Sequence, residues 1–591
     1  MDSHHREAPL GDDMTSTTAT EDTPLLSPRA ESPALSGVSS EIYRDNPAGN
    51  QEHQEDLDTP NQKVSKRRGV AIILSVYVLI FLLAMNMSGI TMAQSTIAED
   101  LDAYEYAMWF TTSFLVAMSS MSPLVGKLAT IFSPRIMLLA SAAEFALGSV
   151  ITSQARTFAV FILGRVVTGA GGGGIMVLSF VLVLELTTKR NRGLFVGLLN
   201  TGLTSGVSLG AVVFGALLAR VGWRALFWIQ APVGLLSGCS IFFSIPRTMS
   251  SNLSRVGDNM STGTKLKRID YFGAIFLCTT VVLFLFGLSN NVEPIPMGLS
   301  LVSLAVFVCI EKFGAVDPII PLTVLQSRGA LLSCVSQLGF MAARWAVLFY
   351  TPITALAIFG FSPAASGSLL VPTNLGFALG GILVGAFHVR RPGSFWLPAL
   401  LCYVLFALSL LALSLCATKT TPLSLFIAVV FINGLFTGGG LNYTLAHLLH
   451  LTLPETHYVA TSLLGTFRGF AGSFGSAIGG GIFARTLRGT LEEGLKAIDG
   501  SEQLRKSRQE LIRKLIGSPA LVYSEGLTAE EHIVAVQGYT AAVKVLFQAG
   551  VVLTAIVLVL QAGTGWKGPA DRVKEDPEAV ADGIGIQSGR A

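Results

Sequence analysis

The sequence predicts an all-α polytopic membrane protein with about 14 transmembrane helices. Of its 591 residues, 51% are hydrophobic and only 13% are charged, whereas soluble domains carry about 25% charged residues. Apolar runs of about 18 to 25 residues recur from Gly69 onward, and each can cross about 30 Å of hydrocarbon as a helix. These runs lack the charged face that the helices of a soluble bundle need. The membrane is therefore the expected environment.

Residues 1–68 precede the first apolar run and are rich in Ser, Thr, Pro, Asp and Glu. They cannot bury enough apolar surface to offset chain entropy, so we expect a disordered cytosolic tail. Within it, Glu21 stands four and five residues before Leu25 and Leu26. This pattern resembles an acidic dileucine sorting signal, which adaptor complexes bind. A chance Leu pair in a disordered tail is an equally good interpretation.

The predicted spans have soft ends, because sequence patterns locate boundaries only to within a few residues. The eighth is the weakest, since it is short and follows Pro294 and Pro296. In order along the chain, the spans are 70–92, 106–126, 135–153, 158–183, 194–219, 224–245, 271–289, 297–314, 330–350, 363–387, 396–417, 423–446, 459–484 and 540–562.

The flanking charges predict the orientation. With the N-terminus in the cytosol, the short connections on the cytosolic side hold 21 Lys and Arg residues and those on the outer side hold four. Cytosolic loops of membrane proteins are enriched in these residues, so both termini are expected in the cytosol. The long segment 485–539 is left out of this count. Within it, residues 500–516 have the periodicity of an amphipathic helix, which we expect on the outer face.

Charged and glycine-rich positions inside the spans are candidates for function. A charge in a span costs a few kcal/mol or more, so Arg165 in the fourth span is a functional candidate. In the fifth span, Gly202, Gly206 and Gly210 repeat every four residues, with Gly215 beyond. This spacing makes a smooth strip on one helix face. Such a strip suits a helix that slides against its neighbour, and it suits static close packing equally well.

These residues resemble the fungal fourteen-span drug:proton antiporter branch of the major facilitator superfamily, and most of all its vacuolar basic amino acid transporters. The resemblance covers about residues 69–565. It rests on the glycines after Arg165, the fifth-span glycines, and three further segments. These segments are Arg192-Gly193 after Glu185, Gly222-Trp223-Arg224 with Phe227 through Pro232, and Phe467-Arg468-Gly469.

The chain departs from the family pattern at several positions. After the second span, Thr130 stands where the family has Asp, and Ser133-Pro134 stand where it has Gly-Arg. Asn86 stands in the first span where an Asp is usual. Ala211 replaces the Pro of the antiporter motif, as the resemblance to basic amino acid transporters implies. The charges that gate relatives are thus reduced in this chain.

The resemblance implies alternating access between two six-helix bundles. The implied domains are a tail (1–68), an N-terminal six-helix bundle (69–246), a cytosolic linker (247–270), two additional spans (271–328), a C-terminal six-helix bundle (329–565) with the outer loop 485–539, and a cytosolic tail (566–591). The expected function is proton-coupled transport of basic amino acids across the vacuolar membrane. One alternative is a multidrug or toxin antiporter at the plasma membrane, which would carry a drug-like cation. The other is a membrane sensor that does not transport.

Proton coupling needs a group whose protonation changes as access switches, and few acids are available in the spans. Glu185 near the end of the fourth span and Glu144 within the third are the candidates, although each could be structural. Arg344 and Arg468 are expected to form ion pairs with acids or to bind a substrate carboxylate. Polar side chains that could line the pathway are Asn86, Gln94, Asn200, Gln230, Gln337, Asn374 and Asn442.

Other function classes find no support in the sequence. It shows no His/Asp constellation for catalysis, and His447, His450 and His457 lack convergent acids or cysteines. The six cysteines lie in or beside apolar runs without C-x-x-C spacing. We therefore expect neither an enzyme nor a bound cofactor or metal. The expected partners are a small-molecule substrate, protons, the lipid bilayer and an adaptor complex at the N-terminal tail, but not nucleic acid.

Overall fold

The computed structural model describes residues 65–186, 192–245, 270–289, 292–314, 327–389, 394–453, 457–500 and 505–566. Within these ranges, every regular element is a helix. The predicted sorting residues Glu21, Leu25 and Leu26 lie outside the described residues, as does the C-terminal tail from residue 567 onward.

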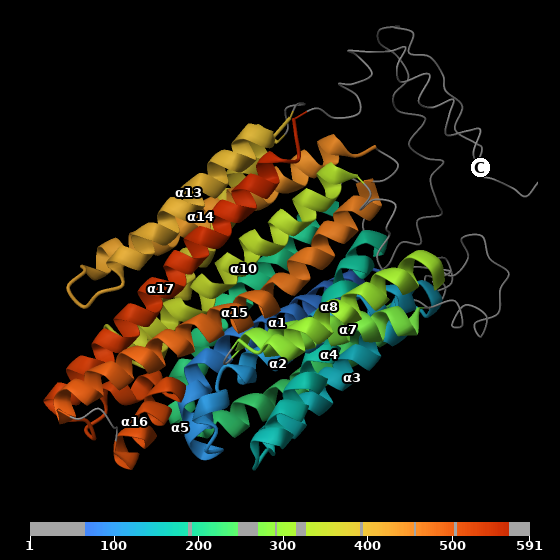
Figure 1. Ribbon diagram of the computed structural model, residues 1–591. Helices are drawn as coiled ribbons and strands as arrows, with labels where there is room; N and C mark the ends of the chain where they lie inside the picture. The colour runs from blue at the N-terminus through green and yellow to red at the C-terminus, as the bar shows by residue number, and fades with distance from the viewer. Residues whose placement is uncertain are drawn as a thin grey trace, which may run out of the picture. The chain divides into compact units, whose positions relative to one another are not determined.

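The first half of the chain forms five long helices, of which the last is bent. α1 (Lys66–Asp100) packs along α5 (Arg192–Ser244), and α2 (Trp109–Ile131) packs along α4 (Phe158–Leu186). α3 (Pro134–Ser153) contacts both α4 and α5. The helices run side by side in the structure (Figure 1).

α5 contains two of the predicted spans, because the backbone reverses within it. Gly222 has φ 74° and ψ 163°, a conformation that is essentially restricted to glycine. Both parts of α5 contact α1: Gly206 lies against Ala84, and Gln230 hydrogen-bonds to Asn86. The indole N–H of Trp223, next to the bend, donates to Asp100 at 3.0 Å. The chain therefore crosses twice beside α1.

The additional helices α7 (Tyr271–Ser289) and α8 (Pro294–Cys309) pack on each other, and α7 also contacts α2 and α15 (Figure 1).

The second half contains α10, which contacts α15 and α17, and α14, which contacts α12 and α13. The bounds of the second-half helices are α10 (Arg328–Ala357), α11 (Pro363–Ser368), α12 (Leu370–Leu383), α13 (Trp396–Cys416), α14 (Leu423–Leu451), α15 (His457–Asp499), α16 (Lys506–Gly517) and α17 (Ala529–Ala562). The short elements are η1 (Tyr104–Tyr106), η4 (Ile310–Gly314), η5 (Val384–His388) and η7 (Pro519–Tyr523).

Among the described residues, 12 helices are long and apolar enough to cross a membrane. They cover 13 of the predicted spans, since α5 holds two. The remaining one, 459–484, is the first part of α15, which is too polar to meet the same criterion. α15 and α1 also extend well past their predicted spans, to Asp499 and Asp100. A helix can continue beyond the hydrocarbon when its last turns carry charges, so the apolar run underestimates its length.

We call the end of the helices at which α1 begins the basal end, and the opposite end the distal end. The distal part of α1 is buried on every side over residues 82–93, and α10 is buried likewise over residues 346–358. A helix with no exposed face must be covered from all directions, so the two halves pack together at the distal end. Toward the basal end, Leu74 of α1 and Leu331 of α10 are exposed. The sequence predicts that this basal end faces the cytosol.

Candidate transport site

A network of side chains surrounds Arg165 in the middle of the first half. Its Nε donates to the Phe110 carbonyl oxygen at 2.7 Å, and its Nη1 donates to the amide oxygen of Asn86. The Asn86 amide nitrogen donates in turn to Gln230 at 2.8 Å. Arg165, Asn86 and Gln230 are almost completely buried. The guanidinium carbon also lies 4.5 Å from the centroid of the Phe114 ring. Neutral groups and an aromatic face therefore hold this cation.

A second network surrounds Arg344 in α10 of the second half. Its Nη1 donates to the Thr373 hydroxyl and, at 3.2 Å, to the amide oxygen of Asn433. Its Nη2 donates to the Thr373 carbonyl at 3.3 Å and to the Asn374 amide oxygen at 3.4 Å. Arg344 is 2% exposed, so its charge depends on these neutral acceptors. The expected acidic partner is wrong for Arg344: none of its hydrogen-bond partners is a carboxylate.

The two networks lie on equivalent pairs of helices, the first and the fourth span of each half. The arginine and the asparagine have exchanged places between these two spans. In the first half, the fourth helix carries Arg165 and the first helix carries Asn86. In the second half, α11, α12 and η5 together form one span, so α14 is the fourth. The first helix, α10, carries Arg344, and α14 carries Asn433. Each half thus joins its first and fourth spans through one Arg–Asn contact, and the positive charge lies on opposite members of the pair.

The glycines of α5 pack mainly against α1. A Cβ at Gly206 would lie 2.6 Å from the Ala84 Cβ, and one at Gly210 would lie 2.6 Å from the Met85 Cα. Gly202 faces Tyr77 less tightly. The strip formed by Gly202, Gly206 and Gly210 therefore allows close packing inside the first half.

The two halves meet farther along α5. A Cβ at Gly215 would lie 2.5 Å from the Pro363 carbonyl carbon of α11, and one at Gly367 would lie 2.7 Å from the Ala211 carbonyl. At the same interface, the Asn374 amide donates to the Ser208 hydroxyl at 2.9 Å. Because Asn374 also accepts from Arg344, the cage of that arginine reaches across to the first half.

Arg468 differs from the other two arginines within the spans. Its side chain is half-buried, and none of the described residues forms a hydrogen bond or an ion pair with it. A Cβ at Gly465 or Gly469, on the same helix face or beside it, would meet no atom within 4 Å. The described residues thus supply no cage of acceptors to the guanidinium of Arg468. Its expected ion pair with an acidic side chain is absent from the described part of the chain.

The candidate acids do not join these networks. Glu144 is half-buried in α3, between the face packed on α4 and α5 and a face that exposes Leu147. The structure describes no hydrogen bond or ion pair of its carboxylate. Glu185 belongs to α4, but its side chain lies outside the described residues.

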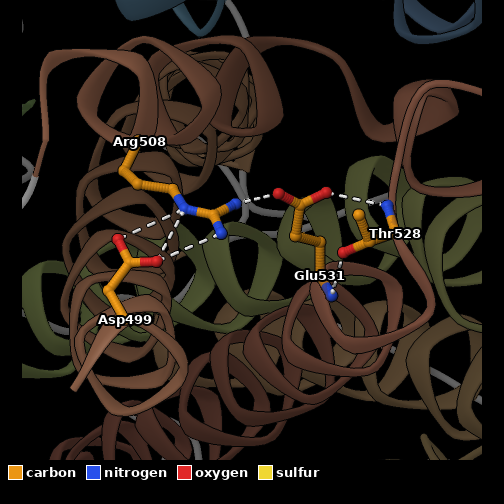
Figure 2. A network of polar contacts seen from close by, with 4 residues as sticks. All are labelled: Asp499, Arg508, Thr528 and Glu531. Atoms are coloured by element: carbon orange, nitrogen blue, oxygen red, sulfur yellow. Dashed lines mark hydrogen bonds and ion pairs between the residues drawn. The ribbon is translucent and has the colours of Figure 1, made fainter.

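At the distal end, α16 connects the two halves. Arg508 forms ion pairs with Asp499 at the end of α15 and Glu531 at the start of α17, and Glu531 also caps α17 together with Thr528 (Figure 2). These contacts attach α16 to the second half. The apolar side of α16 is buried through Ile512 and Leu515, which confirms the predicted amphipathic helix from Lys506 onward.

The other side of α16 contacts the first half. Arg513 forms an ion pair with Asp102, which follows α1, and its guanidinium carbon lies 5.5 Å from the centroid of the Tyr104 ring. The Gln94 amide of α1 donates to the Gly517 carbonyl at 3.4 Å, and Arg488 of α15 lies 3.8 Å from Glu105. We call this set of contacts the distal link.

The structure has two halves with a buried arginine in each. Comparison with known families identifies the fold to which this arrangement belongs. Residues 75–479 match the Major Facilitator Superfamily. The chain belongs to this superfamily. The relatives described below are named as transporters or for multidrug resistance.

Relatives within the superfamily have different stated activities. The chain is 29% identical to vacuolar basic amino acid transporter 1 of Saccharomyces cerevisiae, over 53% of this chain and 56% of the relative. It is 27% identical to the transporter TwmF of Talaromyces wortmannii, over 55% of this chain and 60% of the relative. It is also 25% identical to multidrug resistance protein fnx1 of Schizosaccharomyces pombe, over 75% and 82%. The first two matches thus span less than two thirds of those relatives.

A solved superfamily structure shares the fold. A bacterial homologue of the human lysosomal transporter Spinster, in an inward-facing and unoccupied conformation, superimposes with a TM-score of 0.56. The alignment covers 85% of this chain and 98% of that chain at 14% identity. This similarity supports the all-α superfamily fold.

Sequence reasoning found the superfamily arginines but missed several of their partners. Thr373 and Asn433 were not singled out, although both lie inside apolar runs, where a polar side chain is a signal in itself. Gln230 and Asn374 were predicted only as general lining residues. Which helix each one faces depends on contacts between distant segments, and no local pattern shows these.

Proposed function

We propose that this superfamily member is a secondary active transporter that moves basic amino acids across the vacuolar membrane by alternating access, in exchange for protons. The observation that carries the proposal is the guanidinium of Arg468, which has no hydrogen-bond or ion-pair partner among the described residues. Arg165 and Arg344 each donate to neutral protein groups, whereas none of the described residues accepts from Arg468, so its donors can serve a solute. An arginine fork matches the two oxygens of a carboxylate, and every free amino acid has one.

The packing supports access to Arg468 from the basal end. The distal ends of the halves are closed by the buried parts of α1 and α10 and by the distal link. α15 begins at the basal end, and Arg468 lies about three turns from its start, where Gly465 and Gly469 face open space. With the basal end in the cytosol, a cytosolic amino acid would reach Arg468 in this conformation. Protons from an acidic vacuole would then drive its accumulation.

The basic side chain of the substrate is supported by the relative that is named a vacuolar basic amino acid transporter. The alternative function is multidrug or toxin export at the plasma membrane, which is supported by the relative named for multidrug resistance. A guanidinium without a partner among the described residues favours a solute with a carboxylate over a drug-like cation that has none, because the carboxylate can pair with it. A sensor without transport is the remaining alternative.

Uptake into vacuolar vesicles tests this proposal. We expect ATP-dependent accumulation of radiolabelled lysine, arginine or histidine that needs this protein and is abolished by a protonophore. Arg468→Gln should raise KM by about tenfold or more, because it removes a charge-assisted contact with the carboxylate. Arg468→Lys should recover part of the affinity.

The control is Arg505→Gln, which makes the same substitution at an exposed position and should leave KM unchanged. An unchanged KM in Arg468→Gln would contradict the assigned carboxylate contact. Protein-independent uptake of all three amino acids would contradict the substrate, and protein-dependent efflux of cationic dyes would then favour the alternative.

A further inference from the structure

A stripe of buried polar residues runs along α14 from the Arg344 cage toward the basal end. Asn433, Thr437, Thr444 and His447 share one face of the helix and are all fully buried. Asn433 accepts from Arg344 at one end of the stripe. Thr444 accepts from the hydroxyl of Tyr403 at 2.9 Å, since its own proton goes to the Gly440 carbonyl. His447 ends the stripe.

The hydrogen bonds of His447 identify which ring nitrogen carries the proton. The Thr564 hydroxyl donates to the Gln561 carbonyl at 2.7 Å, and a hydroxyl has only one proton to donate. The contact of 3.0 Å between His447 Nε2 and the Thr564 oxygen must therefore be donated by Nε2. In the neutral ring, Nδ1 then carries no proton and has a free lone pair. None of the described residues forms a hydrogen bond with it.

Other buried polar atoms without a described partner lie at the basal end of α10 and α17 in the second half. Gln561 of α17 and Gln337 of α10 are fully buried, and neither side-chain amide has a hydrogen-bond partner in the described part of the chain. The hydroxyl of Ser333, one turn from Gln337 on α10, is also buried without a partner. A Cβ at Gly563 would lie 3.3 Å from Leu332, which places the basal part of α10 beside the Gln561 turn of α17.

Such a cluster is costly in an apolar interior. An unsatisfied buried polar group destabilises a protein by about 1–3 kcal/mol. Three polar side chains without a described partner, and an imidazole with one nitrogen unpartnered, therefore need a reason other than stability. Amide and hydroxyl oxygens such as theirs are hydrogen-bond acceptors that a cation in an apolar interior requires.

We propose that His447 is the group that binds the coupled proton, at Nδ1. This inference rests on the proposed proton exchange. The proton adds to the free lone pair to give an imidazolium and leaves again as the neutral ring re-forms, so no other reactant is needed. Histidine is the side chain whose charge ordinarily changes between pH 5 and 8.

Few other titratable groups face this position. His450, one turn away on α14, has its ring centroid 6.4 Å from that of His447. Cys334 of α10 is also buried, and Tyr403 of α13 reaches the stripe through Thr444. The described residues of α10, α13 and α14 include no Asp or Glu, and the acids of α17, Glu530 and Glu531, lie at its distal start.

The position of His447 also accounts for the exchange of protons against a basic amino acid. A protonated His447 adds a second buried cation to the half that already holds Arg344. Charges in a low-dielectric interior repel over long distances. Proton binding therefore opposes the binding of a cationic amino acid, and each weakens the other by the same factor. A proton and a basic amino acid would then occupy the protein in turn.

The test uses the full chain reconstituted in liposomes, with radiolabelled L-lysine as the probe. Two activities are compared: accumulation driven by an inside-acidic pH gradient, and lysine–lysine counterflow without a gradient. We expect His447→Gln to keep counterflow within about twofold while losing gradient-driven accumulation by about tenfold or more. The control is His532→Gln at the distal end, which should keep both activities. Thr564→Val keeps the imidazole but removes its partner, so it should retain coupling with a shifted pH dependence.

Titration of carbon-13-labelled histidine in lipid nanodiscs separates this inference from the function it rests on. The His447 signal, assigned by its absence in His447→Gln, should change in a pH titration from about 3 to 8 and move when lysine is added. Wild-type accumulation by His447→Gln, loss of its counterflow as well, or a signal that does not change over that titration would each overturn the inference. Absence of lysine transport by the wild type would overturn the proposed function, and the titration would still decide whether His447 binds a proton.

Discussion

At the residue scale, the buried arginines show how this protein places charge in a membrane. An arginine in a span costs several kcal/mol unless acceptors replace its water. Arg165 and Arg344 obtain these acceptors from amides, hydroxyls and carbonyls rather than carboxylates. Asn86 is central to the first network because it accepts from Arg165 and donates to Gln230. Asn86 therefore links the Arg165 guanidinium to Gln230.

The role of Asn86 can be measured by substitution. Asn86→Ala leaves a guanidinium nitrogen and the Gln230 oxygen unpaired, so we expect a loss of about 2–4 kcal/mol of stability. Asn86→Asp keeps an acceptor for Arg165 and adds the opposite charge, so it should unfold at or above the wild-type temperature at neutral pH. Thermal unfolding in detergent micelles measures both.

Asn442→Ala is the control for these variants, because that side chain donates only to backbone carbonyls and is half-buried. An Asn86→Ala variant as stable as Asn442→Ala would show that Arg165 does not depend on the amide.

The sequence alone identified Arg165, Asn86 and Arg344, because a polar group in an apolar run is visible without a structure. It did not identify what these residues bind. A cation in a span suggests a carboxylate partner, but the described partners of Arg344 are amide, hydroxyl and carbonyl oxygens. For Arg468 the described residues include no partner, so its expected ion pair stays a prediction. Asn433 lies 89 residues from Arg344, so only the packing of α10 against α14 reveals the contact.

At the element scale, the glycine strip of α5 decides how closely the first-half helices approach. Gly206 and Gly210 leave no room for a side chain, because the atoms in the way belong to the α1 backbone or its first side-chain atoms. Spacing alone allowed sliding or static packing. The short distances favour static packing along α1, whereas Gly215 and Gly367 lie where the two halves meet.

Substitution of Gly206 tests this packing. Gly206→Ala would force α1 and α5 apart, and such overpacking costs about 1–3 kcal/mol. Gly489→Ala in α15 is the matched control, since its Cβ would meet no atom within 4 Å. That change should stabilise the helix by about 0.5–1 kcal/mol, because alanine loses less conformational freedom than glycine. Opposite shifts in unfolding temperature are expected, and a stabilised Gly206→Ala would show that α5 is loosely packed.

The observed helix ends agree with the predicted span ends only where the helix ends with its apolar run. Apolar runs predicted the positions of α3, α7 and α13 to within a few residues. They missed the continuation of α15 to Asp499, because charged turns outside the hydrocarbon remain helical. They also separated the two parts of α5, which are joined by the bend at Gly222 rather than by a polar loop.

At the scale of the whole molecule, the distal link joins the halves on the side where they are closed. α16 is anchored to the second half through Arg508 (Figure 2) and to the first half through Arg513. Alternating access requires the halves to separate at this end. The distal link must then break, so its strength contributes to the balance between the two conformations.

Charge reversal at the distal link should shift that balance. Arg513→Glu repels Asp102, and an exposed ion pair contributes about 0.2–1 kcal/mol, so we expect distal opening to increase about two- to fivefold. The readout is the rate at which a membrane-impermeant maleimide labels Ser95→Cys, in a background without the native cysteines. Ser95 lies beneath η7 and accepts from the Ala520 amide.

The double reversal, Asp102→Arg with Arg513→Glu, restores opposite charges and should return labelling toward the starting rate. Equal labelling of all variants would show that the distal link does not restrain the distal end.

The exchanged positions of arginine and asparagine limit how the two halves can recombine. Exchanging α1 with its counterpart α10 would bring the arginine of α10 to face Arg165. Two guanidinium groups would then share one apolar interior, while the other half kept two amides without a cation. A crossover that exchanged single helices between the halves would therefore yield a protein that cannot fold stably. One that moved the first and fourth helices together would preserve each contact, so the pair is the smallest unit that can be inherited intact.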